Sequence, residues 1–175
     1  MNIEEQLQVE HSKANALYIA NYIGNDQSKF TELVGLFLGD DYRTTQRAGH
    51  ALSTVFDVYP ELIKPHIDKI ILNLEKDVND AVKRNTLRIL QDKTIPEAHE
   101  GFLANKCFDY LLSNKEPVAI KAFAMTVLAN LCVKYPDLKN ELKTIIEDLM
   151  ENGTPGILSR GKSVLKKLNT IISTV

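Results

Sequence analysis

Hydrophobic residues recur at the spacing of an α-helix along most of the chain. One run follows the i, i+3, i+4, i+7 pattern at Ile67, Ile70, Ile71 and Leu74. A second run follows nearly the same pattern over residues 138–149. The segment 117–134 is apolar nearly all round, which predicts a helix sandwiched between neighbours. Because no segment alternates apolar and polar residues as a β-strand does, the pattern predicts an all-α protein.

Prolines and short polar breaks separate the helical runs. Five of the six prolines lie at such breaks, where proline suits the first turn of a helix: Pro60, Pro96, Pro117, Pro136 and Pro155. The breaks predict about nine helices, over residues 3–23, 26–38, 42–58, 60–75, 79–92, 96–112, 117–134, 136–151 and 155–172. An alternative for the first of them is a division into two helices at His11-Ser12. Pro65 and Gly101, each five positions past a boundary proline, predict kinks inside two of them.

Internal repetition indicates how these helices are organised. The phrase Tyr-Pro-Glu-Leu at 59–62 returns as Ile-Pro-Glu-Ala at 95–98 and as Tyr-Pro-Asp-Leu at 135–138. A basic residue near the start of the following helices recurs at intervals of 37, 37 and 39 residues, at Arg47, Arg84, Lys121 and Arg160. A period of about 38 residues is typical of an α-solenoid, in which antiparallel helical hairpins stack on their neighbours.

The residues around this period resemble the HEAT repeat of the HEAT/armadillo superfamily. Val82-Lys83-Arg84 and Ile120-Lys121-Ala122 each follow a polar turn and lead into a helix. Together with Gln46-Arg47-Ala48 they are similar to a group of small uncharacterised bacterial HEAT-like proteins. The resemblance implies a right-handed α-α superhelix that forms a single domain over 1–175. Within it we expect an N-terminal capping helix at 1–25 and repeats at about 26–58, 59–94, 95–134 and 135–175.

Some of those bacterial proteins carry the label adenylosuccinate lyase. The lyase family has far larger chains and a flexible serine-containing loop with a Met-Pro-x-Lys-x-Asn core. This chain contains no such stretch. We therefore reject that activity here.

Composition and charge narrow the range of functions. The chain has 175 residues, of which 44% are hydrophobic and 25% charged, so it can bury a core without a metal or a disulfide. The net charge of -2 disfavours general binding of nucleic acid, though a local basic patch is still compatible with it. No secretory signal or membrane span is evident, and Cys107 and Cys132 lack CxxC spacing. We therefore expect reduced thiols in a cytoplasmic protein.

One segment matches a known nucleotide-binding motif: Gly156–Ser163 fits the phosphate-loop expression GxxxxGK[ST]. That loop requires a buried strand before it, whereas an amphipathic helix precedes it here. We expect a coincidental match within the last helix. The four histidines lie on four predicted helices without zinc-ligand spacing. We accordingly expect no catalytic residue, no metal site and no cofactor, and a protein that is not an enzyme.

The recurring basic residues are the best candidates for binding. The candidate groove residues are Arg43, Arg47, Arg84, Arg88, Lys121 and Arg160. In HEAT repeats the second helix of each hairpin lines a concave groove, so the resemblance implies that these side chains meet an acidic peptide or a phosphate. The same resemblance offers a structural alternative, in which the recurring residue pairs with aspartates of the inter-helix turns, here Asp40, Asp41, Asp77 and Asp80.

The leading hypothesis is a non-enzymatic protein-protein interaction or scaffold module that binds a protein or peptide through its concave face. The alternative is nucleic-acid or phosphate binding along the basic residues, which the net charge disfavours. We expect a monomer or a weak homodimer. Residues 155–175 contain four basic and no acidic residues, which suits a terminal capping helix and is also where an anionic partner would bind.

Overall fold

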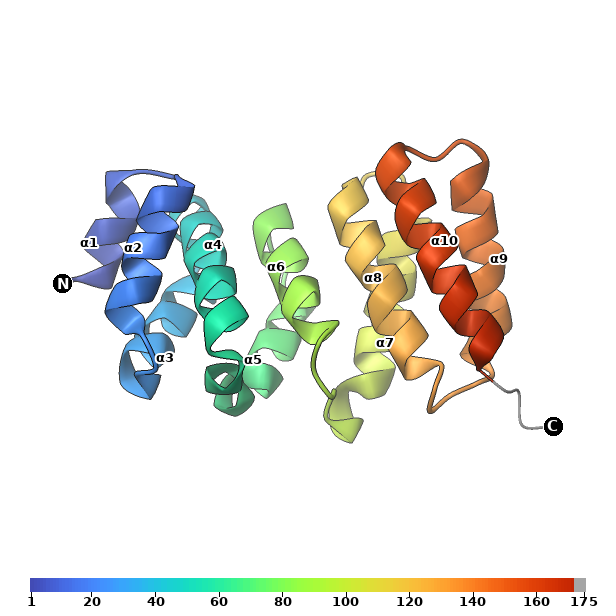
Figure 1. Ribbon diagram of the computed structural model, residues 1–175, viewed down its shortest axis with the longest axis horizontal. Helices are drawn as coiled ribbons and strands as arrows, with labels where there is room; N and C mark the ends of the chain where they lie inside the picture. The colour runs from blue at the N-terminus through green and yellow to red at the C-terminus, as the bar shows by residue number, and fades with distance from the viewer. Residues whose placement is uncertain (172–175) are drawn as a thin grey trace. The chain divides into compact units, whose positions relative to one another are not determined.

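A computed structural model describes residues 1–171, and its regular elements are all helices (Figure 1). They are α1 (Ile3–Val9), α2 (Lys13–Ile23), α3 (Gln27–Phe37), α4 (Tyr42–Val58), η1 (Pro60–His66), α5 (Ile67–Leu72), η2 (Asn73–Glu75), α6 (Asp80–Leu90), α7 (Glu97–Leu112), α8 (Val118–Leu131), α9 (Leu138–Glu151) and α10 (Pro155–Thr170). The helices pack in successive pairs, so the all-α solenoid prediction is confirmed. The chain divides into two compact units, Met1–Ile89 and Leu90 onward.

The first unit is built around α4. This helix packs against both α2 and α3, and η1 packs against α3 and α4. Figure 1 shows α2, α4 and α6 side by side, with α3 and α5 behind them. Phe30, Phe37 and Leu52 are fully buried between these layers. The core therefore fixes α4 against α2 and α3.

The second unit is built around α8, which packs against α7, α9 and α10. Ala124, Met125 and Leu128 on α8 have no exposed surface. The prediction that this apolar helix is sandwiched between neighbours is confirmed. No helix in the described part of the chain is long and apolar enough to cross a membrane.

Residues 3–23 form α1 and α2 with a break at Glu10–Ser12, so a single helix there is wrong and the alternative break at His11-Ser12 is confirmed. Ser12 caps α2, since its hydroxyl accepts a hydrogen bond from the Asn15 amide at 3.0 Å. The buried Asn15 side chain donates to the carbonyls of Gln6 and Glu10, both at 2.9 Å. These bonds satisfy backbone groups that a continuous helix would have paired internally.

The helix predicted over residues 60–75 is also divided, into η1, α5 and η2. Pro65 lies inside η1. It has no amide hydrogen, and its ring clashes with the carbonyl four residues earlier in an α-helix, so the chain takes the tighter 3-10 form. Gly101 has no such effect, since α7 runs through it as one helix of 16 residues.

Candidate functional site

The structure separates the six basic residues chosen from the sequence into two groups. In the first group, the side chain donates hydrogen bonds to other groups of the protein; its members are Arg47, Arg88, Lys121 and Arg160. In the second group, the residue is exposed to solvent; its members are Arg43 and Arg84. The sequence period therefore collects residues with different roles.

Arg47 and Lys121 bind the C-terminal ends of neighbouring helices. Arg47 Nη1 donates to the main-chain oxygen of Leu7 at 2.7 Å, near the end of α1. Lys121 Nζ donates to the main-chain oxygen of Leu111 at 3.1 Å, near the end of α7. Such carbonyls lack partners within their own helix and carry partial negative charge. Burial lowers the pKa of Lys121, while the carboxylate of Glu116 acts in the opposite direction.

Arg160 joins α10 to α8 within the second unit. Its Nη1 donates to Thr126 Oγ1 at 2.5 Å and to Gln91 Oε1 at 3.2 Å, and its guanidinium lies 5.6 Å from the centre of the Phe123 ring. Arg47, Lys121 and Arg160 thus bind carbonyl, hydroxyl and amide oxygens rather than aspartates of the turns. Asp41 instead caps α4 by accepting from the Thr44 amide at 2.7 Å.

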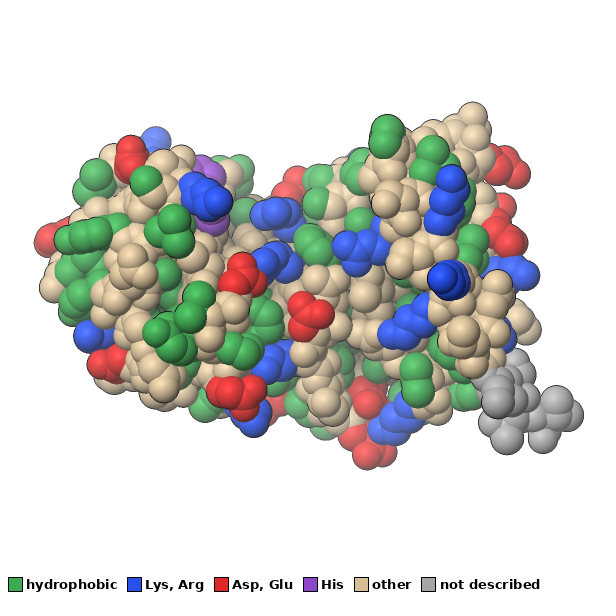
Figure 2. Space-filling view, in the orientation of Figure 1, with side chains coloured by type: hydrophobic (Ala, Val, Ile, Leu, Met, Phe, Trp, Pro, Cys, Tyr) green, Lys and Arg blue, Asp and Glu red, His purple; other side chains and the backbone are tan. Residues whose placement is uncertain are grey.

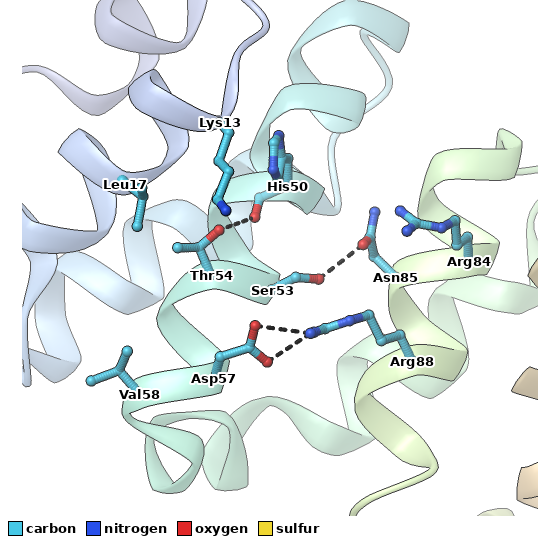
Figure 3. Close-up of a pocket in the computed structure, with 10 residues that line it drawn as sticks. All are labelled: Lys13, Leu17, His50, Ser53, Thr54, Asp57, Val58, Arg84, Asn85 and Arg88. Atoms are coloured by element: carbon cyan, nitrogen blue, oxygen red, sulfur yellow. Dashed lines mark hydrogen bonds and ion pairs between the residues drawn. The ribbon is translucent and has the colours of Figure 1, made fainter.

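The first unit contains a cavity of about 400 Å³ along α2, α4 and α6, which we call the α2–α4–α6 groove (Figure 3). Its walls come from α2 and α6, and α4 forms its floor (Figure 3). The lining residues are Lys13, Leu17, His50, Ser53, Thr54, Asp57, Val58, Arg84, Asn85 and Arg88. The groove thus collects two of the basic residues predicted from the sequence, Arg84 and Arg88.

Hydrogen bonds between α4 and α6 hold the floor of the groove. Ser53 Oγ donates to Asn85 Oδ1 at 2.8 Å, and Asn85 Nδ2 donates to the Ala81 carbonyl at 2.8 Å. Asn85 is 3% exposed, so its amide is almost fully withdrawn from water. Buried polar groups that are satisfied in this way fix the positions of the helices that carry them.

The charges that line the groove are only partly compensated. Arg88 Nη2 lies 2.7 and 2.8 Å from the two carboxylate oxygens of Asp57, the acidic residue of the lining. The other two cationic residues of the lining, Lys13 and Arg84, form no ion pair with any residue within 1–171. In Figure 3 the Arg84 side chain lies on the α6 wall and Lys13 on the α2 wall. The groove therefore carries uncompensated positive charge.

The positive charge of the groove helps to lower the pKa of His50. Its pKa is lowered first by burial and then by the positive charges of His11, Arg84 and Lys13. The rings of His11 and His50 lie edge to face, with centres 5.8 Å apart. Figure 2 shows histidine directly beside a basic side chain on the surface of this unit. Near neutral pH, His50 thus contributes a polar ring rather than a further cation.

Apolar side chains lie on the same groove. Leu17 on α2 is 43% exposed, and Val58 at the end of α4 is 64% exposed. Single exposed aliphatic side chains are ordinary on a protein surface, but here two of them line the same cavity. The groove thus offers an apolar region beside a basic one.

Sequence reasoning missed most of this site. Lys13, His50 and Asp57 fall outside the 38-residue series, and Leu17 has the spacing of an ordinary core-facing residue. Lys13 and Leu17 are four residues apart, which places them on one face of a helix. Only the packing of α2 against α4 shows that this face lines the same groove as α6.

A second cavity, of about 520 Å³, lies in the second unit beside Glu100 and Lys134. Glu100 is 8% exposed, and its Oε2 accepts hydrogen bonds from Lys134 Nζ at 2.7 Å and Tyr135 Oη at 2.5 Å. These bonds lower the pKa of Glu100. Because Glu100 and Lys134 neutralise each other, this cavity offers a ligand less charge than the α2–α4–α6 groove.

The phosphate-loop match does not form a loop. Gly156–Ser163 lies inside α10, so its amides belong to a helix rather than to a phosphate cradle. Among residues 1–171, no three side chains of His, Cys, Asp or Glu are grouped so as to hold a metal ion.

Comparison with protein families finds one match that spans nearly the whole chain. A family model described as a HEAT repeat domain matches residues 3–168. Comparison with curated proteins and with solved structures finds no match. The match covers all ten α-helices except the last residues of α10.

Proposed function

The chain belongs to the HEAT repeat family, and we propose that it is a non-enzymatic interaction module that binds a partner protein through the α2–α4–α6 groove. HEAT repeat domains typically serve as protein-interaction scaffolds and are usually not catalytic. The observation that carries the proposal is that exposed Leu17 and Val58 and unpaired Lys13 and Arg84 line one groove. Binding sites of this kind pair an apolar centre with polar groups at its edge.

Among the six basic residues, we propose that Arg84 contacts the partner and that Arg88 shapes the groove through Asp57. Arg43 is exposed but does not line the groove. Arg47 is occupied by a helix end. Lys121 and Arg160, in the second unit, are likewise engaged with groups of that unit.

We further propose a cytoplasmic location. Cys107 and Cys132 are both free and buried. Free thiols of this kind suit a compartment that keeps cysteines reduced.

Site-directed photo-crosslinking in a native lysate tests the proposal. A photoreactive amino acid replaces Leu17 in the groove or, as a matched control, Leu72 on α5, which is 42% exposed against 43% for Leu17. We expect discrete protein adducts from position 17 that are absent from position 72. Arg84→Glu should abolish them, whereas Lys69→Glu, which reverses an exposed charge on α5, should leave them unchanged. Equal adducts from both positions, or none from position 17, would contradict the proposal.

Phosphate binding is the second candidate, because Lys13 and Arg84 also suit a nucleic-acid backbone. Against it, the residues that line the groove include no Phe, Tyr or Trp on which a base could stack. Titration of labelled RNA and DNA at about 50 mM and about 200 mM salt separates the two functions, because phosphate contacts weaken steeply with salt. We expect no binding at either concentration.

A further inference from the structure

We propose that the α2–α4–α6 groove recognises an acidic segment of its partner, with an Asp or Glu carboxylate bound between Lys13 and Arg84 and an apolar side chain packed against Leu17 and Val58. The inference rests on the proposed function and adds the chemistry of the ligand. The ligand is a segment of a protein, and the experiment below distinguishes it from a nucleic acid.

The charge of the groove indicates an anionic ligand. Asp57 is already bound by Arg88, with both of its carboxylate oxygens within 2.8 Å of Nη2. Lys13 and Arg84 therefore face the groove without an acidic partner among the described residues. Their positive charge also acts on His50, whose pKa it lowers in addition to the effect of burial. A carboxylate placed here would compensate positive charge that no acidic residue of the lining compensates.

The chemistry of the lining favours a carboxylate on a polypeptide over a phosphate on a nucleic acid. The planar guanidinium of Arg84 can bind both oxygens of a carboxylate at once. Leu17 and Val58 supply aliphatic surface that a sugar-phosphate backbone cannot use. An Asp or Glu close to an apolar residue on one side of a peptide satisfies both regions together.

The groove is held in shape before any ligand arrives. The Ser53–Asn85 and Arg88–Asp57 contacts join α4 to α6 at two heights, as Figure 3 shows. Lys13 and Leu17 stand on α2, which packs against α4. A preformed surface of this kind loses little conformational freedom on binding, so a short segment can bind it without a large interface.

Selection from a random peptide library displayed on phage tests the inference. The immobilised full-length protein is the target, and the Arg84→Glu protein removes peptides that bind elsewhere. Recovered peptides are synthesised with a fluorescent label, and their affinities are measured by anisotropy. We expect them to contain Asp or Glu close to an aliphatic or aromatic residue.

Variants of the groove then locate the contacts. Lys13→Glu, Arg84→Glu and Leu17→Asp should each weaken the selected peptides by about tenfold or more, whereas Lys69→Glu should change affinity by less than about twofold. A peptide whose acidic residue is changed to Lys should lose affinity for the natural protein and regain it for Arg84→Glu. Because Lys13, Leu17 and Arg84 are exposed, these variants should fold normally, which circular dichroism checks.

Selected peptides without an acidic residue would overturn the inference, as would selection of no peptide that prefers the natural protein over Arg84→Glu. Tight binding of a labelled RNA or DNA that Arg84→Glu abolishes would replace the peptide with a nucleic acid. These failures differ from failure of the proposed function. If position 17 still crosslinks to a protein while the selected peptides lack acidic residues, the proposed interaction function is supported and only the proposed preference for an acidic segment is wrong.

Discussion

Arg47 on α4 donates a hydrogen bond from Nη1 to the main-chain oxygen of Leu7, 2.7 Å away, and so binds the C-terminal end of α1. The residue 74 positions later in the basic series, Lys121, makes the equivalent contact with Leu111 at the end of α7. In both cases a cation from a second helix of a hairpin satisfies a carbonyl of another helix. Part of the basic period thus serves the joints of the solenoid rather than its surface.

Replacing Arg47 with Met should therefore destabilise the protein by about 1–3 kcal/mol, because the Leu7 carbonyl loses a charged donor. Arg43→Met is the matched control, since Arg43 lies one turn earlier on α4 and is exposed. Its effect should stay within about 0.5 kcal/mol. Urea unfolding measures both, and equal losses in the two variants would show that the helix-end contact contributes nothing.

Two helical glycines should respond to alanine in opposite directions. A Cβ atom at Gly35 on α3 would meet no atom within 4 Å, so Gly35→Ala should stabilise the protein by about 0.5–1 kcal/mol through helix propensity. A Cβ atom at Gly49 on α4 would lie 2.7 Å from Asn85 Nδ2 and 3.1 Å from Phe37 Cε2. Asn85 cannot move freely because Ser53 holds it, so Gly49→Ala should cost about 1–3 kcal/mol. Thermal unfolding compares the two, and a gain at Gly49 would refute the close packing of α4 on α6.

Stability should fall below neutral pH because of His66. This buried side chain lies 3.1 Å from Gln27 Nε2 and 3.2 Å from Thr31 Oγ1, and its pKa is lowered first by burial and then by Lys69. A lowered pKa means that the unfolded chain takes up a proton more readily. The stabilising contribution is therefore complete above the ordinary value of 6.5 and is lost as the pH falls toward the lowered value.

The His66→Gln variant separates this effect from others. Its free energy of unfolding should change less than that of the natural protein between about pH 7.5 and about pH 5.5. His50, whose pKa is also lowered, remains in the variant and should retain part of the pH dependence. If the two proteins lose stability in parallel, protonation of His66 is not the cause.

Both cysteines should resist alkylation in the folded protein. Burial raises the pKa of the Cys107 thiol far above its usual range and raises that of Cys132 to about 11. The reactive thiolate is therefore scarce at neutral pH, and both sulfur atoms are shielded from reagent. Treatment with iodoacetamide, followed by mass spectrometry, should leave the native protein unmodified and label both residues in urea. A singly labelled native protein would show that one thiol becomes accessible without unfolding.

Part of the fold could be predicted from the sequence because it follows from local rules. Pro96, Pro117 and Pro155 lie at or just before the starts of α7, α8 and α10, as their lack of an amide hydrogen predicts. Apolar periodicity placed the helices and showed that α8 would be buried. From the sequence the break at His11-Ser12 is only an alternative to a continuous helix, because the buried hydrogen bonds of Asn15 that stabilise it depend on how α1 folds back against α2.

The all-α class, the 38-residue period and membership of the HEAT repeat family can thus be read from residue spacing along the chain. The tertiary structure alone decided which cations remain available. Arg47 and Arg84 are indistinguishable in the period, yet one binds a helix end and the other faces a groove. A charge is compensated by whatever lies within a few ångströms of it, and helices far apart in the sequence assemble that neighbourhood: α1 lies beside Arg47, whereas α2, α4 and α6 line the groove at Arg84.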